Sequence, residues 1–260
     1  MLAEYQKRRL YFAVRGIAVT LNFAHRGFSG QFPENTMLAF EKAVEAGADG
    51  IELDVQFSKD GELVIMHDET LNRTAGVDGF VKDYTLEQLK AMDVSGKWGD
   101  RYGSMEIPTL REYFEHFKDL PVITNIELKT GIFPYPGIEE RILEMIREYE
   151  LENKIIISSF NHYSCLKMKE LDEKMPCGLL EESWIVGAGK YGRKLGMDFL
   201  HPAYPMVTES YVQDAADHGL KVNTWTVNDW DSMEYFTKIG VNAIIGNFPD
   251  LAEKALNPYR

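Results

Sequence analysis

Residues 46–55 read Ala-Gly-Ala-Asp-Gly-Ile-Glu-Leu-Asp-Val, and they join a helical pattern to a strand pattern through one glycine. Upstream, Phe40 and Val44 have the four-residue spacing of a helix face, and downstream residues 50–56 alternate as a strand does. Gly47 is therefore predicted to end a helix and to turn the chain directly into a strand. Such a short connection is typical of α/β proteins.

The same glycine punctuation recurs at Gly196, Gly219 and Gly240, each just before an apolar segment. The predicted strands are 17–25, 50–56, 122–128, 155–158, 177–180, 198–201, 220–227 and 241–245. Helices are predicted between them at roughly 137–150, 161–171, 208–218 and 230–238. This alternation over about 250 residues predicts a (β/α)8 TIM barrel. A doubly wound open sheet is the alternative, but it normally carries a glycine-rich phosphate loop after its first strand, and the sequence shows none there.

One segment interrupts the alternation after the second strand. Residues 59–61, Lys-Asp-Gly, predict a hairpin turn, and residues 63–66 the returning strand. The segment at about 68–107, rich in charge, glycine and tyrosine, is predicted to be a small insertion or a lid. No Ser/Gly-rich or Pro-rich linker marks a boundary elsewhere, so we expect a single barrel domain over residues 1–260.

The composition restricts the classes of partner. A hydrophobic content of 45% is enough for a sizeable core. The net charge of −13 argues against a nucleic-acid or anionic-membrane partner, because both need a basic surface. An anionic substrate would then be attracted locally, by a bound cation and a few placed Arg or Lys. Cys165 and Cys177 lack metal-ligand spacing and are interpreted as buried free thiols, which disfavours a disulfide-dependent secreted fold.

The first 21 residues are basic and then partly apolar. Arg15 interrupts the apolar stretch and no small-residue cleavage site is evident, so we interpret the segment as a short helix or arm rather than a signal peptide. A cytoplasmic location is expected on this basis. No segment has the length of a membrane span, and no stable membrane association is expected. The chain could form a homo-oligomer.

Two carboxylates alternate with apolar residues on the second predicted strand. Glu52 and Asp54 are two apart and point to one face, while Ile51, Leu53 and Val55 form the other. In a closed barrel the acidic face points inward, where unpaired carboxylates are costly and a bound cation would remove the cost. The alternative is an ordinary amphipathic strand with one solvated face.

A second strand favours the cation. Asn125, Glu127 and Lys129 share one face there, so Glu127 adds a third carboxylate to Glu52 and Asp54. All-oxygen ligation suits a hard cation, Mg2+ or Ca2+, better than Zn2+. Lys129 could pair with Glu127 or with a substrate oxygen.

Two histidines lie at predicted strand ends, where barrel enzymes keep their catalytic residues. His25 is followed by Arg26, whose guanidinium can grip a phosphate through two hydrogen bonds, and by Gly27, which lets the backbone approach a ligand. His67 is followed by Asp68, which could orient its ring. Two imidazoles that titrate near neutrality are suited to act as base and acid in phosphate ester cleavage.

Other polar residues are secondary candidates. Thr36 or Asn35 is predicted to cap the helix that follows, and Glu34 or Asn35 could also reach the site. Trp225 lies near a strand end and could form an apolar wall beside a substrate alcohol, or fill the core. His201 is a weaker candidate for the site. The remaining histidines are interpreted as structural: His116, His162 and His218.

In this order and spacing, the motifs resemble the glycerophosphodiester phosphodiesterase family. The motifs that carry the resemblance are His25-Arg26-Gly27, Pro33-Glu34-Asn35-Thr36, Gly50-Ile51-Glu52-Leu53-Asp54-Val55, His67-Asp68, Asn125-Ile126-Glu127-Leu128-Lys129 and Thr224-Trp225-Thr226-Val227-Asn228. The resemblance covers nearly the whole chain. It implies a TIM barrel with an insertion after the second strand, which hydrolyses small-molecule glycerophosphodiesters to sn-glycerol 3-phosphate and an alcohol.

The resemblance also implies roles for single residues. A divalent cation would be held by Glu52, Asp54 and Glu127. The acid/base pair matches His25 and His67, and Arg26 and Lys129 match positions that contact phosphate. One departure is Gly246-Asn247-Phe248-Pro249, where members often carry Thr-Asp before the last Pro; the lost charge bears on substrate selection.

Several questions stay open at this point. The nucleophile is either water or the substrate's own glycerol hydroxyl, by way of a cyclic phosphate, and either histidine can be the acid. A phospholipase-D-like enzyme acting on intact lipids would need an exposed apolar or basic docking surface, which the acidic composition disfavours. A non-catalytic headgroup-binding barrel is disfavoured because all matching catalytic positions are filled. A cyclic-phosphate lyase is the third alternative.

Overall fold

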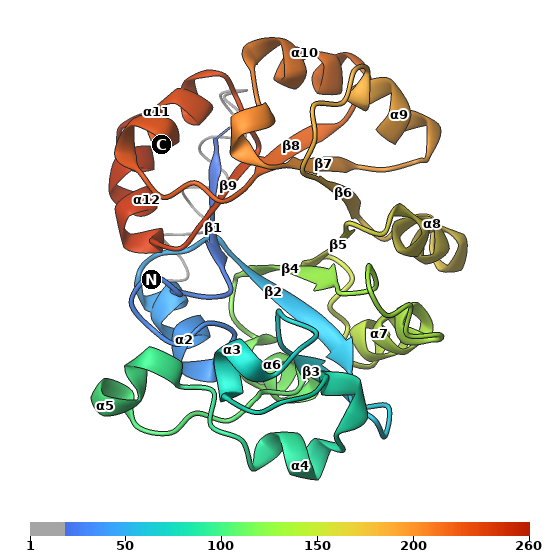
Figure 1. Cartoon of the computed structure of the whole chain (residues 1–260). Helices are drawn as coiled ribbons and strands as arrows, with labels where there is room; N and C mark the ends of the chain where they lie inside the picture. The colour runs from blue at the N-terminus through green and yellow to red at the C-terminus, as the bar shows by residue number, and fades with distance from the viewer. Residues whose placement is uncertain (1–18) are drawn as a thin grey trace.

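The computed structural model describes residues 19–260. Eight parallel strands form a closed barrel in the order β1-β9-β8-β7-β6-β5-β4-β2, and pairing of β1 with β2 closes it. These strands are β1 (Leu21–His25), β2 (Gly50–Phe57), β4 (Ile123–Leu128), β5 (Ile155–Ser159), β6 (Cys177–Glu181), β7 (Phe199–Pro202), β8 (Lys221–Thr224) and β9 (Ala243–Gly246). Figure 1 looks into the barrel, with strands inside and helices outside. The predicted TIM barrel is confirmed.

The outer helices cover the apolar faces of the strands. They are α2 (Met37–Glu45), α6 (Leu110–Phe117), α7 (Ile138–Glu148), α8 (His162–Leu171), α9 (Ala188–Lys194), α10 (Glu209–Asp217), α11 (Trp230–Lys238) and α12 (Pro249–Leu256). Ile51, Leu53 and Val55 are fully buried in the main core, as their alternation predicts. The predicted turn glycines all have positive φ, between 74° and 86°: Gly47, Gly196, Gly219 and Gly240.

Some boundaries differ from the sequence predictions. The last residues of the predicted strand 220–227 lie beyond β8, which ends at Thr224. The predicted N-terminal arm lies outside the described residues, apart from its end. Between residues 19 and 260, no helix combines the length and apolar character needed to cross a membrane. Cys165 and Cys177 are buried and free, as predicted.

The segment between β2 and α6 lies outside the barrel. It begins with β3 (Leu63–Ile65), which pairs antiparallel with β2 as the hairpin prediction requires. It continues through short helices: α3 (Asn72–Ala75), η1 (Val81–Asp83), α4 (Leu86–Lys90), η2 (Gly96–Trp98) and α5 (Gly99–Tyr102). A small apolar cluster of its own, including Leu71, Val81 and Leu89, holds it together. Tyr102 stacks on Phe32 with ring centroids 5.0 Å apart, which ties this segment to the loop after β1.

Two further short 3-10 helices lie after β7 and at the C-terminus. They are η3 (Tyr204–Met206) and η4 (Asn257–Tyr259). Because all barrel strands are parallel, the loops after β5, β6, β7 and β8 share the end of the barrel with His25, at the end of β1. The loops that follow the strands therefore surround a single mouth.

Candidate active site

Three carboxylates converge inside the mouth of the barrel. The register of β2 and β4 sets Glu52 opposite Asn125 and Asp54 opposite Glu127. One oxygen from each of Glu52, Asp54 and Glu127 lies within 4.8 Å of the others, and all three side chains are buried. The convergence predicted from two strand patterns is confirmed.

The crowding of these acids changes their ionisation. Burial, together with the charges of Asp54 and Glu127, raises the pKa of Glu52 well above its ordinary value. Burial and Asp54 likewise raise the pKa of Glu127. Like charges this close in a buried site oppose each other's ionisation. The cluster therefore favours a compensating positive charge.

Two cationic side chains partly balance the cluster. The Nε of Arg26 lies 3.6 Å from Oδ2 of Asp54. The Nζ of Lys129 lies 2.8 Å from Oε1 of Glu127 and 3.8 Å from Oδ1 of Asp54. Burial raises the pKa of Asp54, but the positive charges of His67 and Arg26, followed by that of Lys129, lower it to about 2. Asp54 is therefore ionised at neutral pH.

The donor set fits a divalent cation. Oδ1 of Asp54 is buried without a hydrogen-bond partner, and the Asn125 Oδ1 beside the cluster also lacks one. Carboxylate oxygens are the ligands that hard divalent cations take. Glu52, Asp54 and Glu127 can thus bind such an ion.

His25 has a neutral partner. Its Nδ1 lies 2.7 Å from the carboxamide Oδ1 of Asn247, which also accepts from the Ser29 hydroxyl at 3.2 Å. Since a carboxamide oxygen only accepts, Nδ1 of His25 carries the proton and Nε2 keeps its lone pair. Burial, then the nearby Arg26 charge, lowers the pKa of His25 to about 4. The ring is neutral at pH 7.

His67 has a charged partner instead. Its Nδ1 lies 2.6 Å from Oδ1 of Asp68, so the neighbour predicted to orient the ring does contact it. Because a carboxylate oxygen only accepts, Nδ1 of His67 carries a proton and its Nε2 is left for the cavity. The hydrogen bond to His67, together with Arg73, holds the pKa of Asp68 below its usual range.

Arg26 is fixed by its backbone as well as by its side chain. Its φ of 55° lies in the left-handed region, and its backbone N–H donates to Oε2 of Glu52 at 2.9 Å. Its Nη1 donates to Oε1 of Glu34 at 3.0 Å. Next to it, Gly27 lies against α2, where a Cβ would come 2.7 Å from the backbone carbon of Ala39.

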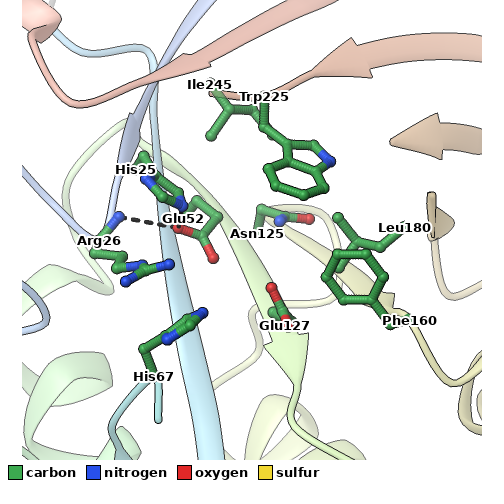
Figure 2. Close-up of a pocket in the computed structure, with 10 residues that line it drawn as sticks. All are labelled: His25, Arg26, Glu52, His67, Asn125, Glu127, Phe160, Leu180, Trp225 and Ile245. Carbon is green, nitrogen blue, oxygen red and sulfur yellow. Dashed lines mark hydrogen bonds and ion pairs between the residues drawn. The ribbon is translucent and has the colours of Figure 1, made fainter. Parts of the chain in front are cut away.

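These groups open onto one cavity with two unlike walls (Figure 2). The polar wall is formed by His25, Arg26, Glu52, His67, Asn125 and Glu127. The apolar wall is formed by Phe160, Leu180, Trp225 and Ile245. Phe160 meets Trp225 edge to face, with centroids 5.5 Å apart. The cavity therefore presents an apolar surface opposite its charged groups.

Not every candidate faces this cavity. Asp54 and Lys129 lie behind its lining, where Lys129 pairs with Glu127 rather than facing open space. His201 is fully buried, accepts from Asn223 at 3.0 Å and does not line the cavity.

The motif before α2 reaches the site. Thr36 caps that helix, as one of the two alternatives predicted. Asn35 donates to Oδ2 of Asp54 at 2.8 Å, and Glu34 binds Arg26. Sequence reasoning did not place Asn247 beside His25, nor Phe160 in the cavity wall. For Phe160 there was a signal, since it directly follows β5.

A TIM barrel whose mouth holds two histidines, an arginine and a buried acidic cluster has the arrangement expected of an enzyme that cleaves phosphate esters. The model of the glycerophosphoryl diester phosphodiesterase family matches residues 25–251. The chain belongs to this family, whose members are phosphoric diester hydrolases, and the family and enzyme class predicted from the motifs are confirmed.

Known proteins of this family resemble the chain in sequence and in structure. A glycerophosphodiester phosphodiesterase of Caldanaerobacter subterraneus subsp. tengcongensis is 45% identical over 231 residues, which are 89% of this chain and 95% of that protein. An Oleispira antarctica phosphodiesterase, solved with the product sn-glycerol-3-phosphate, is 29% identical with a TM-score of 0.84, covering 92% of this chain and 97% of that one. A Silicibacter pomeroyi structure shares the fold, with a TM-score of 0.85 at 23% identity and coverage of 93% and 94%.

Proposed function

We propose that this protein hydrolyses glycerophosphodiesters, small-molecule substrates, to sn-glycerol 3-phosphate and an alcohol. The observation that carries the proposal is the pair of histidines with opposite partners at one cavity, beside Arg26 and the acidic cluster. The product bound by the Oleispira antarctica relative supports the same substrate class. Residues 19–260 would act as one catalytic domain, with the segment after β3 packed onto it.

A divalent cation belongs to the proposal. Glu52, Asp54 and Glu127 would hold Mg2+ or Ca2+, and the bound ion would offset charge on the non-bridging phosphate oxygens. Arg26 lines the same wall and would donate to these oxygens through its guanidinium. Lys129, paired with Glu127, would hold that carboxylate in place rather than reach the phosphate itself. Trp225 would pack against the carbon atoms of the substrate.

His25 is assigned as the general base. Its Nδ1 donates to the carboxamide of Asn247, which leaves the Nε2 lone pair free to accept a proton. That proton comes from the attacking hydroxyl, of water or of the substrate's own glycerol. A neutral ring at pH 7 is the state that this role needs.

His67 is assigned as the general acid. The carboxylate of Asp68 accepts from Nδ1 and orients the ring, so that Nε2 of His67 would deliver a proton to the departing alkoxide. When the alcohol has left, His25 carries an extra proton and His67 has lost one. If water was the nucleophile, exchange with solvent restores both rings. If the glycerol hydroxyl was the nucleophile, water then opens the cyclic phosphate with the two histidines in exchanged roles, which yields sn-glycerol 3-phosphate and restores both rings. The two partners, one amide and one carboxylate, support different roles for the two rings, which the sequence left open.

The test is a panel of glycerophosphodiesters, assayed with and without a chelator and followed by phosphorus NMR. We expect release of glycerol phosphate that stops on chelation and returns with Mg2+ or Ca2+. A transient cyclic phosphate would identify the internal hydroxyl as the nucleophile. Accumulation of cyclic phosphate as the final product would identify a lyase, and an inactive protein would contradict the proposal.

A second candidate activity has one observation in its favour. The loops after β5 and β6 expose large apolar side chains beside the mouth, among them Phe160 at 42%, Trp184 at 67% and Val186 at 102% of full exposure. Such a surface could hold the acyl chain of a lysophospholipid while the same histidines cleave its headgroup. Comparing glycerophosphocholine with lysophosphatidylcholine, in the wild type and in Trp184→Ala, separates the two activities. A preference for the lipid that the substitution removes would favour this candidate.

A further inference from the structure

Arg73 lies at the centre of an ion-pair network beside the cavity. It belongs to α3, in the segment between β3 and α6. Its Nε donates to Oδ2 of Asp68 at 2.6 Å. Its Nη1 and Nη2 donate to the two oxygens of Glu34 at 2.8 and 2.7 Å. One guanidinium therefore occupies three carboxylate oxygens from two separate loops.

Both carboxylates that Arg73 holds have a second partner in the site. Glu34 accepts from Nη1 of Arg26 at 3.0 Å, and Asp68 accepts from Nδ1 of His67 at 2.6 Å. The contacts thus form a continuous chain from Arg26 to His67, with Arg73 in the middle. Arg26 comes from the loop after β1 and His67 from the loop after β3, so this chain joins two parts of the polar wall.

We propose that Arg73 is a positioning residue that sets the placement of His67 relative to Arg26. The inference rests on the proposed function, in which these two side chains act on the leaving alkoxide and on the phosphate. The planar fork of arginine can satisfy both oxygens of Glu34 and one of Asp68 at once. The single ammonium of a lysine cannot hold both carboxylates in the same geometry.

An exposed ion pair alone would contribute little, and the Arg73 side chain is half exposed. The carboxylates it joins are more shielded, at 23% exposure each, and each is also tied to a group in the cavity. Without Arg73, Glu34 and Asp68 would repel each other and could turn away from Arg26 and His67. A displacement of about 1 Å at a reacting group can cost about 10²-fold in rate.

The segment has another attachment to the same loop. Tyr102 stacks on Phe32, and its hydroxyl donates to the backbone oxygen of Gln31 at 3.1 Å. The apolar cluster that holds the segment together also does not involve Arg73. Substitution of Arg73 should therefore leave the segment folded and placed on the barrel, so that effects on activity can be measured.

The experiment compares Arg73→Ala and Arg73→Lys with the wild type on a glycerophosphodiester. We expect Arg73→Ala to lower kcat at least tenfold with a smaller change in KM, and Arg73→Lys to recover only part of the loss. The matched control is Arg147→Ala, which removes an equally exposed arginine bound to Asp172 at 2.9 Å on the outside of the barrel. That variant should keep the wild-type kcat.

A double-mutant cycle with Glu34 tests the route. On a Glu34→Ala background, Arg73→Ala should lower kcat less than it does in the wild type, because the link from Arg73 to Arg26 is already broken. A full additional loss there would overturn the proposal, and so would wild-type kcat in both Arg73 variants. If Arg73→Ala fails to fold, the kcat of Arg73→Lys decides. An inactive wild type would instead contradict the proposed function.

Discussion

The Nδ1 of His25 lies 2.7 Å from the carboxamide oxygen of Asn247, which joins residues 222 positions apart in the chain. This contact arises because β1 and β9 are neighbours in the barrel and both end at the same mouth. The Asn247 backbone is itself fixed, since its N–H donates to Oδ1 of Asn228 at 2.8 Å. The base is therefore oriented by a neutral group, in contrast to His67 and its carboxylate.

Replacing Asn247 by Asp should shift the pH dependence of the reaction. A carboxylate beside Nδ1 favours the charged ring and raises the pKa of His25, which in the wild type lies below the usual 6.5. His25 must be neutral to act as base, so activity is lost as pH falls through its pKa. The acid limb of kcat/KM against pH should move up by about 1–2 pH units in Asn247→Asp.

The matched control for this prediction is Asn153→Asp, an exposed change in the turn between α7 and β5, at the opposite end of the barrel from the mouth. This variant adds the same charge and should fold and keep the wild-type pH profile. An unchanged acid limb in Asn247→Asp would show that His25 is not the group that must lose its proton.

Removing each histidine should separate the base from the acid. Both His25→Ala and His67→Ala should lose about 10²-fold or more in kcat while keeping the wild-type melting temperature. A p-nitrophenyl phosphodiester needs little help from an acid, because its leaving group is already stable as an anion. His67→Ala should therefore recover much of its rate on that substrate, whereas His25→Ala should not. The reverse pattern would exchange the two assignments.

Local patterns in the sequence were sufficient to predict most of the barrel. The alternation in residues 50–56 predicts both the strand and its inward acidic face, because side-chain direction in a strand depends only on parity. The end of β8 was wrong by three residues, since Trp225 and the residues after it are as apolar and β-branched as the strand itself. Helices α6 and α12 were not predicted. The sequence did contain a signal for α6, because its buried residues Tyr113, Phe114 and Phe117 have a helical spacing.

Contacts across the chain could be predicted only in part. The convergence of Glu52 and Glu127 follows from the strand patterns once their strands are neighbours. The pairing of Asn247 with His25 and the bridge formed by Arg73 do not follow from any local pattern, because each depends on how a loop packs. The segment containing Arg73 shows no regular hydrophobic period, so its short helices could not be placed.

The crowding of Glu52, Asp54 and Glu127 allows a prediction of how the melting temperature depends on a divalent cation. Glu52→Gln removes one charge from the cluster but keeps an oxygen that can accept from the Arg26 backbone N–H. Without added metal, its melting temperature should equal or exceed that of the wild type, because burial and then the charges of Asp54 and Glu127 raise the pKa of Glu52. Saturating Mg2+ or Ca2+ should stabilise the wild type by about 2.7 kcal/mol at a hundred times Kd.

Glu52→Gln should lose most of this metal-dependent stabilisation. Glu144→Gln, an exposed change on α7, serves as the control and should respond to the cation as the wild type does. Thermal melts with and without the ion provide the measurement. Equal stabilisation of all three proteins would exclude Glu52 from the cation site.

Gly27 links the site to the packing of the barrel. Comparing alanine substitutions at Gly27 and Gly61 tests this link. Gly27 has a φ of 76°, and a Cβ there would lie 2.7 Å from the backbone carbon of Ala39. Gly61, in the turn between β2 and β3, has a φ of 82° but nothing within 4 Å of such an atom. Gly61→Ala therefore measures the cost of the left-handed backbone alone, about 1 kcal/mol.

Gly27→Ala adds a clash with the backbone of α2, and should lower the free energy of unfolding by about 3 kcal/mol in urea titrations. Because α2 cannot move without displacing the loop that carries Arg26, Gly27→Ala should also reduce kcat, whereas Gly61→Ala should not. Equal losses of stability in the two variants would mean that the contact with Ala39 does not fix this loop.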